Sequence, residues 1–404
     1  MIMKRSMIAA ALILKATASF AQISDDAVRI GVLNDRSGPY ADFAGEGSVV
    51  AARLAVEDFG GTVAGKPIEI LYADHQNKAD VGAAIAKRWF DVDGVDLVID
   101  MPNSAVALAV QNQAREMGRV TVAVSAINMD IHGPACTPTS LHWGLDTYSL
   151  AAGPVKALID RGEDRWFFLT VDYSGGHSLE KEGGGAVLRN GGTIAGNVRH
   201  PLNVTDMSSF LLQAQSSKAK VIALASAGHD TVNAIKGASE FGLADGGQKL
   251  VALFFSDTEV RGLGLPVAQN MMMAASFYWD RDEQSRAFSR RFFERRKAMP
   301  TQFQAGVYTA IAHYLKAITR AGTDDGKTVV AAMKDMPVDL FGHPGKVRAD
   351  GRMVFDSLLM QVKTPAESKD GWDLLKLVAT VPAEAGFRPI DQGGCPLVAA
   401  AKAR

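Results

Sequence analysis

The chain has 404 residues, of which 47% are apolar, so it is long enough for two or three domains with sizeable cores. Residues 1–21 contain three of the 43 basic residues and no acidic one, which leaves 40 basic against 44 acidic residues and a net charge of −4. This weak negative charge excludes nucleic acid as an electrostatically held partner.

The first 21 residues have the order of features of a secretory signal peptide. Lys4 and Arg5 form a basic start, Met7–Leu14 is apolar, and small residues at 19 and 21 predict cleavage near Ala21. The alternative is an ordinary N-terminal helix. No later stretch approaches the ~20 apolar residues of a membrane span. We therefore expect a mature chain that is soluble and periplasmic or secreted.

Strand-like and helix-like segments alternate through most of the chain. The expected strands are 29–33, 68–72, 97–101, 120–124, 166–171, 193–198, 221–226 and 250–255. The expected helices are 47–59, 80–90, 105–117, 177–190, 208–215 and 230–241. This alternation is typical of parallel sheets covered on both faces, and a break near 141–151 indicates two similar lobes.

The last third of the chain has a different pattern. Residues 283–297, 304–321 and 327–336 are expected to form helices, and Pro337 ends the last of them. Two strand-like runs, 358–363 and 374–380, follow. This order indicates that the chain crosses between the lobes more than once.

Catalytic and metal-binding signatures are mostly absent. The sequence has no G-x-S-x-G, H-E-x-x-H, C-x-x-C or P-loop pattern, and its eight His residues lack metal-ligand spacing. The run Ser178–Lys181 fits S-x-x-K, but the partner motifs are missing, so a helix face is the better interpretation. We expect no enzyme activity, no metal and no cofactor.

Polar groups follow the expected strands at their carboxyl ends, where open α/β sheets place ligands. Ser104 is placed to cap the helix from Ala105, where free N–H groups suit a carboxylate; a plain cap without a ligand is the alternative. The other candidates at strand ends are Asn103, Ser125, Ala126, Asn128, Tyr173, Ser226 and Asp257.

Several segments, in order and spacing, resemble the leucine/isoleucine/valine-binding family of extracytoplasmic solute-binding proteins that serve ATP-driven importers. The opening IGVLNDRSGPYADFAGEG looks like the strand-SGP-aromatic start of that family. The segments VDYSGG, FLLQAQSSKAKVIALASAGHD and QAGVYTAIAHYLKAI match its later landmarks. The resemblance covers nearly all of the mature chain and implies two Rossmann-like lobes joined by three strands.

The resemblance also implies roles for single residues. Ser104 matches the position that holds the ligand carboxylate, with Asn103 beside it, and Phe43 matches an aromatic wall. Asp257 lies near the acidic residue that pairs with the ammonium group of an amino acid.

Two positions depart from the pattern of amino-acid binders. The second aromatic of the D-Y-x-[FY]-G pattern is Gly175 here, and Ala227 and Gly228 stand where a Tyr is frequent. These changes predict a wider pocket on the second lobe and place leucine-like specificity in doubt. His177 and His229 stand beside the vacated positions and are candidates for new contacts.

Together these features predict an α/β fold of the type I periplasmic binding protein class. Lobe 1 would comprise residues 28–145 and 278–341, and lobe 2 residues 146–277 and 342–396. The expected function is to capture a small carboxylate, either a hydrophobic amino acid or an aromatic or short aliphatic acid, for the permease and ATPase of an ABC importer. A ligand sensor of the same fold and a secreted hydrolase remain the alternatives.

The chain contains two cysteines, Cys136 and Cys395. In an oxidising compartment an even pair favours a disulfide, and two buried free thiols are the alternative.

Overall fold

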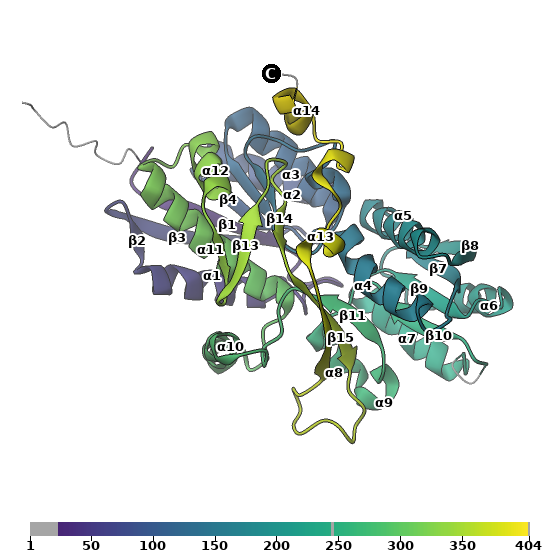
Figure 1. Ribbon diagram of the computed structural model, residues 1–404. Coiled ribbons are helices and arrows are strands. Elements are labelled where there is room, and N and C mark those ends of the chain that lie inside the picture. The colour runs from purple at the N-terminus through teal and green to yellow at the C-terminus, as the bar shows by residue number, and fades with distance from the viewer. Residues whose placement is uncertain (1–22, 244–245, 403–404) are drawn as a thin grey trace, which may run out of the picture.

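The computed structural model describes residues 23–243 and 246–402, and it consists of two α/β bodies that lie side by side (Figure 1). We call them the first and the second lobe and define each by its central sheet below. The predicted signal peptide and its cleavage near Ala21 fall outside the described residues. Within the described ranges, no helix has the length and apolar character needed to cross a membrane.

The first lobe is built on a six-stranded sheet with the order β2-β3-β1-β4-β5-β6. All pairs are parallel except β2 with β3. The strands are β1 (Val28–Asn34), β2 (Thr62–Val63), β3 (Lys66–Asp74), β4 (Leu97–Asp100), β5 (Val120–Ala123) and β6 (Ser140–His142). Its helices are α1 (Gly45–Phe59), α2 (Ala79–Asp91), α3 (Ser104–Met117), α10 (Glu283–Arg296), α11 (Gln302–Ala321) and α12 (Gly326–Asp335), with a short 3-10 helix, η1 (Met129–Ile131), after β5.

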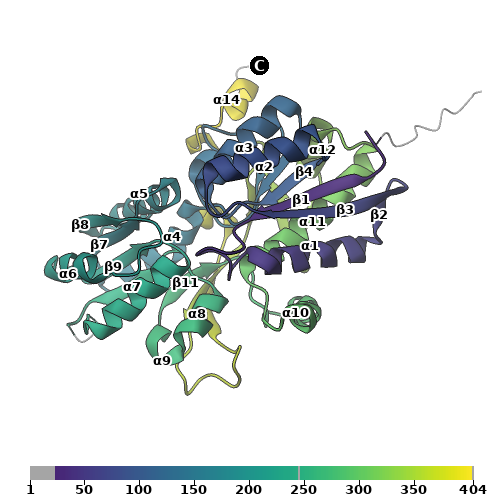
Figure 2. The same ribbon diagram turned by 180° about the vertical axis from the view of Figure 1, so that it is seen from behind.

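The central strand β1 is buried at six of its seven positions. Ile30 and Val32 pack into the same hydrophobic cluster as residues of α1 and α11, whereas Leu33 packs with residues of α2 and α3. A Cβ atom at Gly31 would lie 2.5 Å from the ring of Trp89 on α2, so only glycine fits there. Figure 2 shows the sheet between α2 and α3 on one side and α1 on the other. Both faces are buried, as expected for a parallel sheet.

The second lobe is built on a four-stranded parallel sheet with the order β10-β9-β7-β8. The strands are β7 (Arg165–Val171), β8 (Thr193–His200), β9 (Val221–Ala225) and β10 (Lys249–Ala252). Its helices are α4 (Thr147–Ile159), α5 (Ser174–Arg189), α6 (Ser208–Ser216), α7 (His229–Glu240), α8 (Asp257–Leu263) and α9 (Leu265–Ala268). In Figure 2, α5 covers one face of this sheet and α6 and α7 cover the other.

Two small antiparallel sheets complete the fold. One has the order β11-β15-β16, formed by β11 (Met272–Ala275), β15 (Ser357–Val362) and β16 (Leu375–Val381). The other has the order β12-β13-β14, formed by β12 (Val338–Leu340), β13 (His343–Val347) and β14 (Met353–Phe355). The predicted lobe division between residues 341 and 342 falls in the turn that joins the paired strands β12 and β13.

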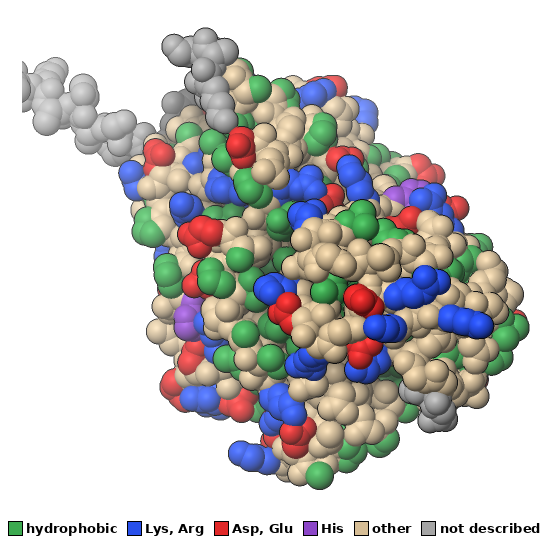
Figure 3. All heavy atoms as spheres, turned by 45° about the vertical axis from the view of Figure 1, so that its right-hand side comes forward, with side chains coloured by type: hydrophobic (Ala, Val, Ile, Leu, Met, Phe, Trp, Pro, Cys, Tyr) green, Lys and Arg blue, Asp and Glu red, His purple; other side chains and the backbone are tan. Residues whose placement is uncertain are grey.

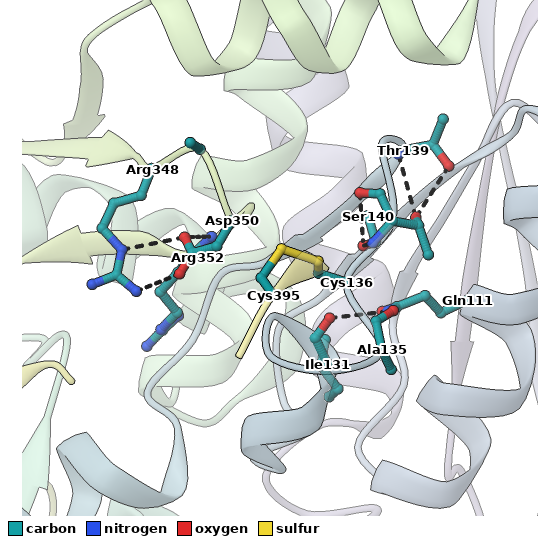
Figure 4. The surroundings of a disulfide bond; sticks show 12 residues. Gln111, Ile131, Ala135, Cys136, Thr139, Ser140, Arg348, Asp350, Arg352 and Cys395 are labelled. Atoms are coloured by element: carbon teal, nitrogen blue, oxygen red, sulfur yellow. Dashed lines mark hydrogen bonds and ion pairs between the residues drawn. A yellow bond between two sulfur atoms is a disulfide. The ribbon is translucent and has the colours of Figure 1, made fainter. Parts of the chain in front are cut away.

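The C-terminal segment contains α13 (Ala383–Gly386), η2 (Ile390–Gln392) and α14 (Pro396–Lys402). A disulfide between Cys136 and Cys395 joins the loop after η1 to the residue before α14 (Figure 4). Gln111 of α3 holds the same loop, because its Nε2 donates to the carbonyl oxygens of Ile131 at 2.9 Å and Ala135 at 2.7 Å. The end of the chain is thereby fixed to the first lobe.

The predicted α/β class with parallel sheets is confirmed. The eight expected strands correspond to β1, β3, β4, β5, β7, β8, β9 and β10, with ends that differ by up to three residues. Helix α4, strand β6 and the sheet β12-β13-β14 were not predicted. Pro154 stands inside α4, where a proline normally indicates the end of a helix.

Candidate ligand-binding site

The strands of both central sheets end at the boundary between the lobes, and the loops that follow them touch across it. The Oη atoms of Tyr40, after β1, and Tyr173, after β7, are 3.1 Å apart. Asn128, after β5, donates from Nδ2 to the carbonyl oxygen of Ser174 at 3.1 Å. Two of the predicted residues, Asn128 and Tyr173, therefore lie at contacts between the lobes.

Asn103, not Ser104, caps α3, which corrects the predicted capping role of Ser104. Asn103 Oδ1 accepts from the N–H groups of Ala105 at 2.9 Å and Val106 at 3.3 Å. Ser104 is the first helical residue and fully buried, and its Oγ accepts from the N–H of Ile127 at 3.4 Å. Two adjacent residues that both suit a cap position could not be distinguished in the sequence.

Ser125 is bonded inside the first lobe. Its hydroxyl donates to Asp100, whose other carboxylate oxygen accepts from Asn34 Nδ2 at 3.0 Å. Asp100 has a φ of 86° and the next residue, Met101, a φ of 52°, so β4 ends in a left-handed turn that residues other than glycine rarely adopt. Burial raises the pKa of Asp100. The strained turn and its hydrogen bonds set the direction in which the chain enters α3.

Phe43 belongs to an aromatic cluster contributed by both lobes. Its ring centroid lies 4.9 Å from that of Phe254, which follows β10, and 5.3 Å from that of Phe303 on α11. The rings of Phe254 and Phe303 stack at 4.8 Å. Sequence analysis missed Phe254 and Phe303, although Phe254 stands at a strand end like the residues that were identified.

The glycines at the vacated aromatic positions have close neighbours, and the wider pocket that they suggested stays a prediction. A Cβ at Gly175 would lie 2.6 Å from Tyr173 Oη, and a Cβ at Gly228 would lie 2.2 Å from the carbonyl oxygen of Pro39. Gly228 also has a φ of 60°. Tyr173 and the Pro39–Tyr40 turn therefore lie against these two glycines.

Of the two histidines proposed as new contacts, His177 lines a cavity of about 520 Å³ together with Asn128 and Ser174. His177 is partly exposed and its Nε2 lies 2.7 Å from Asp172 Oδ1. His229 is exposed at the start of α7. The remaining predicted positions are buried: Ala126, Ala227, and Ser226, whose Oγ lies 2.9 Å from Thr231 Oγ1.

Two acidic residues of α8 are buried, and the sequence analysis identified one of them. Burial raises the pKa of Asp257 to about 7, and burial together with this carboxylate raises the pKa of Tyr278. Burial also raises the pKa of Glu259 to about 8. Glu259 Oε2 accepts from Ser256 Oγ at 2.7 Å, and its Oε1 has no partner within the described ranges.

Glu259 lies where the lobes touch. It lies near Gly228, where an added Cβ would meet the carbonyl oxygen of Pro39, and it is close enough to Asp42 of the first lobe for that charge to add to the rise in its pKa that burial causes. Glu259 is in the first turn of α8, a helix that follows strand β10. This position after a strand end is the sequence feature that could have identified it as a site residue.

A groove of about 370 Å³ opens at this edge of the boundary. Residues of both lobes line it: Asp42, Thr258, Arg261, Gly262, Arg296, Lys297, Ala298, Met299, Gln304 and Trp372. Three of them are cationic and one is acidic. Elsewhere, the face in Figure 3 shows basic and acidic side chains interspersed, without a continuous basic area. In the parts of the chain that the structure describes, no group of three or more His, Cys, Asp or Glu residues could hold a metal ion.

Comparison with known proteins agrees with this architecture. A family model described as periplasmic binding protein matches residues 27–371. A periplasmic binding protein from Burkholderia mallei is 46% identical, with a TM-score of 0.90 over 92% of this chain and 99% of that chain. A branched chain amino acid ABC transporter periplasmic ligand-binding protein from Burkholderia xenovorans is 37% identical, with a TM-score of 0.82 over 92% and 99% of the two chains.

A more distant structure shares the fold. A solute binding protein of an ABC transporter from R. palustris, in complex with 4-hydroxybenzoate, has a TM-score of 0.83 at 21% identity, over 91% of this chain and 100% of that chain. No curated protein matches the sequence. The family model matches most of the chain, and two of the related structures are 46% and 37% identical to it. The chain therefore belongs to the periplasmic binding protein family.

Proposed function

We propose that this protein captures a small carboxylate between its two lobes and delivers it to the permease and ATPase of an ABC importer. One observation carries the proposal. Glu259 Oε1 is buried without a partner in the described part of the chain, at the place where polar groups of both lobes meet. A buried unpaired oxygen is unfavourable, and a ligand that brings a donor would satisfy it.

Ser104 is the proposed partner of the ligand carboxylate. Its Oγ acts as an acceptor toward Ile127 N–H, so the hydroxyl proton is available for donation to a carboxylate. The N-terminus of α3, a helix of 14 residues, adds a favourable dipole. The loop of Ser125, Ala126 and Asn128 would border the same end of the ligand.

The opposite end of the ligand would meet the second lobe. Phe43 of the first lobe, with Phe254 and Phe303, would supply an apolar wall, and Tyr173, Gly175, Ser226 and Ala227 would lie on the other side of the ligand. Glu259, together with Asp257, would receive a donor of the ligand, either the ammonium group of an amino acid or the hydroxyl of an aromatic acid. The names of the relatives support both ligand classes, because one is called a branched chain amino acid binder and another holds 4-hydroxybenzoate.

The cellular setting follows from the same resemblance. We propose that residues 1–21 direct export, that the signal is cleaved near Ala21, and that the mature protein works in the periplasm without catalysis. The groove lined by Arg261, Arg296 and Lys297 would attract an anionic ligand at the open edge of the site.

A thermal-shift screen tests the proposal with leucine, valine, phenylalanine, benzoate and 4-hydroxybenzoate. A bound compound at a hundred times its Kd should raise the free energy of unfolding by about 2.7 kcal/mol. A panel without any stabilising compound would contradict the small-carboxylate proposal.

The variant Ser104→Ala tests the site itself. It removes one charge-assisted hydrogen bond, so the affinity for the compound found should fall about tenfold to a hundredfold in calorimetry. The matched control is Ser289→Ala on α10, which removes another fully buried serine hydroxyl outside the boundary between the lobes. Equal effects of the two variants would remove Ser104 from the site.

A further inference from the structure

A chain of buried hydrogen bonds begins at the carbonyl oxygen of Ala126, in the loop after β5. His142 of β6 lies with Nε2 at 2.8 Å from this oxygen, and both residues are fully buried. A carbonyl oxygen can only accept, so His142 Nε2 carries a proton and donates it. The direction of the Ala126 carbonyl is therefore set by a side chain of the neighbouring strand.

The next bond joins two histidines. His132 Nδ1 and His142 Nδ1 are 2.8 Å apart. Burial holds the pKa of His142 at about 3 and the pKa of His132 well below its usual range, so both rings are neutral near pH 7. Since the one proton of neutral His142 is on Nε2, its Nδ1 accepts and His132 Nδ1 donates.

An ion pair continues the chain on the other side of the histidines. Arg352 Nε donates to Asp146 Oδ2 at 2.7 Å, and Arg352 Nη1 donates to the carbonyl oxygen of His142, also at 2.7 Å. His132 Nε2 lies 3.7 Å from the same Asp146 oxygen but carries no proton in this tautomer, so the ion pair is linked to the histidines through the bond from Arg352 to the His142 carbonyl. All four side chains are at most 2% exposed, and Arg352 also lies over the ring of Phe387, with 4.6 Å between its Cζ and the centroid.

These residues stand where the chain passes between the lobes. Asp146 caps α4, the first helix of the second lobe, directly after the crossing from β6. Arg352 precedes β14, from which the chain continues into β15 of the sheet that contacts the second lobe. One buried network thus joins the loop after β5 to two crossing segments.

We propose that His142 is a positioning residue for ligand binding, which fixes the Ala126 carbonyl and couples the loop of residues 125–128 to the two crossing segments. The inference rests on the proposed function, because that loop borders the ligand there. Without the His142 donor, the Ala126 carbonyl is buried and unpaired, so the loop turns to find another partner.

The test compares His142→Phe, which keeps a ring of similar size without a donor, with His142→Gln, whose Nε2 can still donate to Ala126. Hydrogen exchange of the peptide 124–131 is measured by mass spectrometry without ligand, and calorimetry measures the affinity for the panel compound that binds the wild type. In His142→Phe we expect exchange to rise and affinity to fall about tenfold each. His142→Gln should keep both near the wild-type values.

His313→Phe is the matched control. His313 of α11 is also buried and lies with Nε2 at 2.9 Å from a carbonyl oxygen, that of Met333, far in sequence from the loop. This variant should lower the melting temperature but leave the exchange of 124–131 and the affinity unchanged.

Three results would overturn the inference: unchanged exchange in His142→Phe, an equal change in His313→Phe, or an equal loss of affinity in His142→Gln. If His142→Phe does not fold, His132→Leu removes the donor to His142 Nδ1, and normal exchange of 124–131 in that variant would also overturn it. If no panel compound binds the wild type, the proposed function fails, and the exchange measurements alone decide the role of His142.

Discussion

Glu259 should make ligand binding depend on pH in a way that reveals the ligand class. Burial raises its pKa from 4.5 to about 8, so in the free protein at pH 7 only about a tenth of the molecules carry an ionised Glu259. The ammonium group of an amino acid beside this carboxyl group favours the ionised form and lowers its pKa. Binding therefore releases close to one proton, and the affinity should rise about tenfold between pH 6 and pH 7.

An aromatic hydroxy acid gives the opposite expectation. Its hydroxyl group can bond to Glu259 while Glu259 stays protonated, so no proton is released and the affinity should be level over this pH range. Calorimetry of leucine and of 4-hydroxybenzoate at pH 7, in phosphate and in Tris, measures the proton count directly, because the two buffers differ in ionisation enthalpy.

Two variants make the experiment decisive. Glu259→Gln removes the titrating group, so the proton release and the pH slope should disappear. Asp257→Asn separates the two proposed acceptors, because Asp257 is buried on the same helix and its pKa is also raised, to about 7; the proton release assigned to Glu259 should persist in this variant. Tight leucine binding without proton release, or a release that persists in Glu259→Gln, would refute the assignment of Glu259 to the ligand ammonium.

The remaining predictions concern the lobes, the disulfide and the buried histidines. Gly228→Ala should weaken ligand affinity by at least about tenfold in calorimetry, because its Cβ would clash with a backbone carbonyl of the other lobe. The control is Gly191→Ala, where the glycine has a positive φ of 84° and no neighbour within 4 Å, and this variant should leave affinity unchanged. Equal losses of affinity in the two variants would contradict the clash. Replacing Cys136 and Cys395 by Ser should lower the free energy of unfolding in urea by about 2–5 kcal/mol, and an unchanged midpoint would count against a stabilising bridge. Burial lowers the pKa of His142 to about 3, so between pH 6.5 and pH 3 this residue is protonated in the unfolded chain but neutral in the folded protein. The wild type should therefore lose stability relative to His142→Gln on acidification, by up to about 1.4 kcal/mol for each pH unit. Parallel curves of stability against pH for the two proteins would refute this.

Much of the secondary structure was predictable because it depends on short stretches of sequence. Strand β1 has apolar residues that point to both faces of the sheet, such as the adjacent Val32 and Leu33, because both faces of a parallel sheet are covered, and this pattern is visible in the sequence. Helix α11 begins with Thr301 and Gln304, whose reciprocal capping bonds form within four residues. Such local signals, and the resemblance of segments in order and spacing, also located the strand ends at which the lobes meet.

The contents of the candidate site depended on contacts between segments that are far apart in the chain. Gly175 and Gly228 suggested empty space in the sequence, and only the folded protein shows that a Cβ atom there would meet Tyr173 or the turn at Pro39. The burial of Glu259 is likewise a result of packing, since the residues beside it in the sequence do not indicate whether it is buried.

The network of His132, His142, Asp146 and Arg352 could not be predicted from the sequence for the same reason, because it too depends on contacts between distant segments. Its members are up to 220 residues apart, and no periodicity links them, because hydrogen bonds depend on the position of atoms in space and not on spacing along the chain. The sequence by itself determined the fold class, the order of most elements and the strand ends that form the boundary. The tertiary structure decided which side chains fill that boundary, which carboxyl group stays unpaired and which histidines hold the loop beside it.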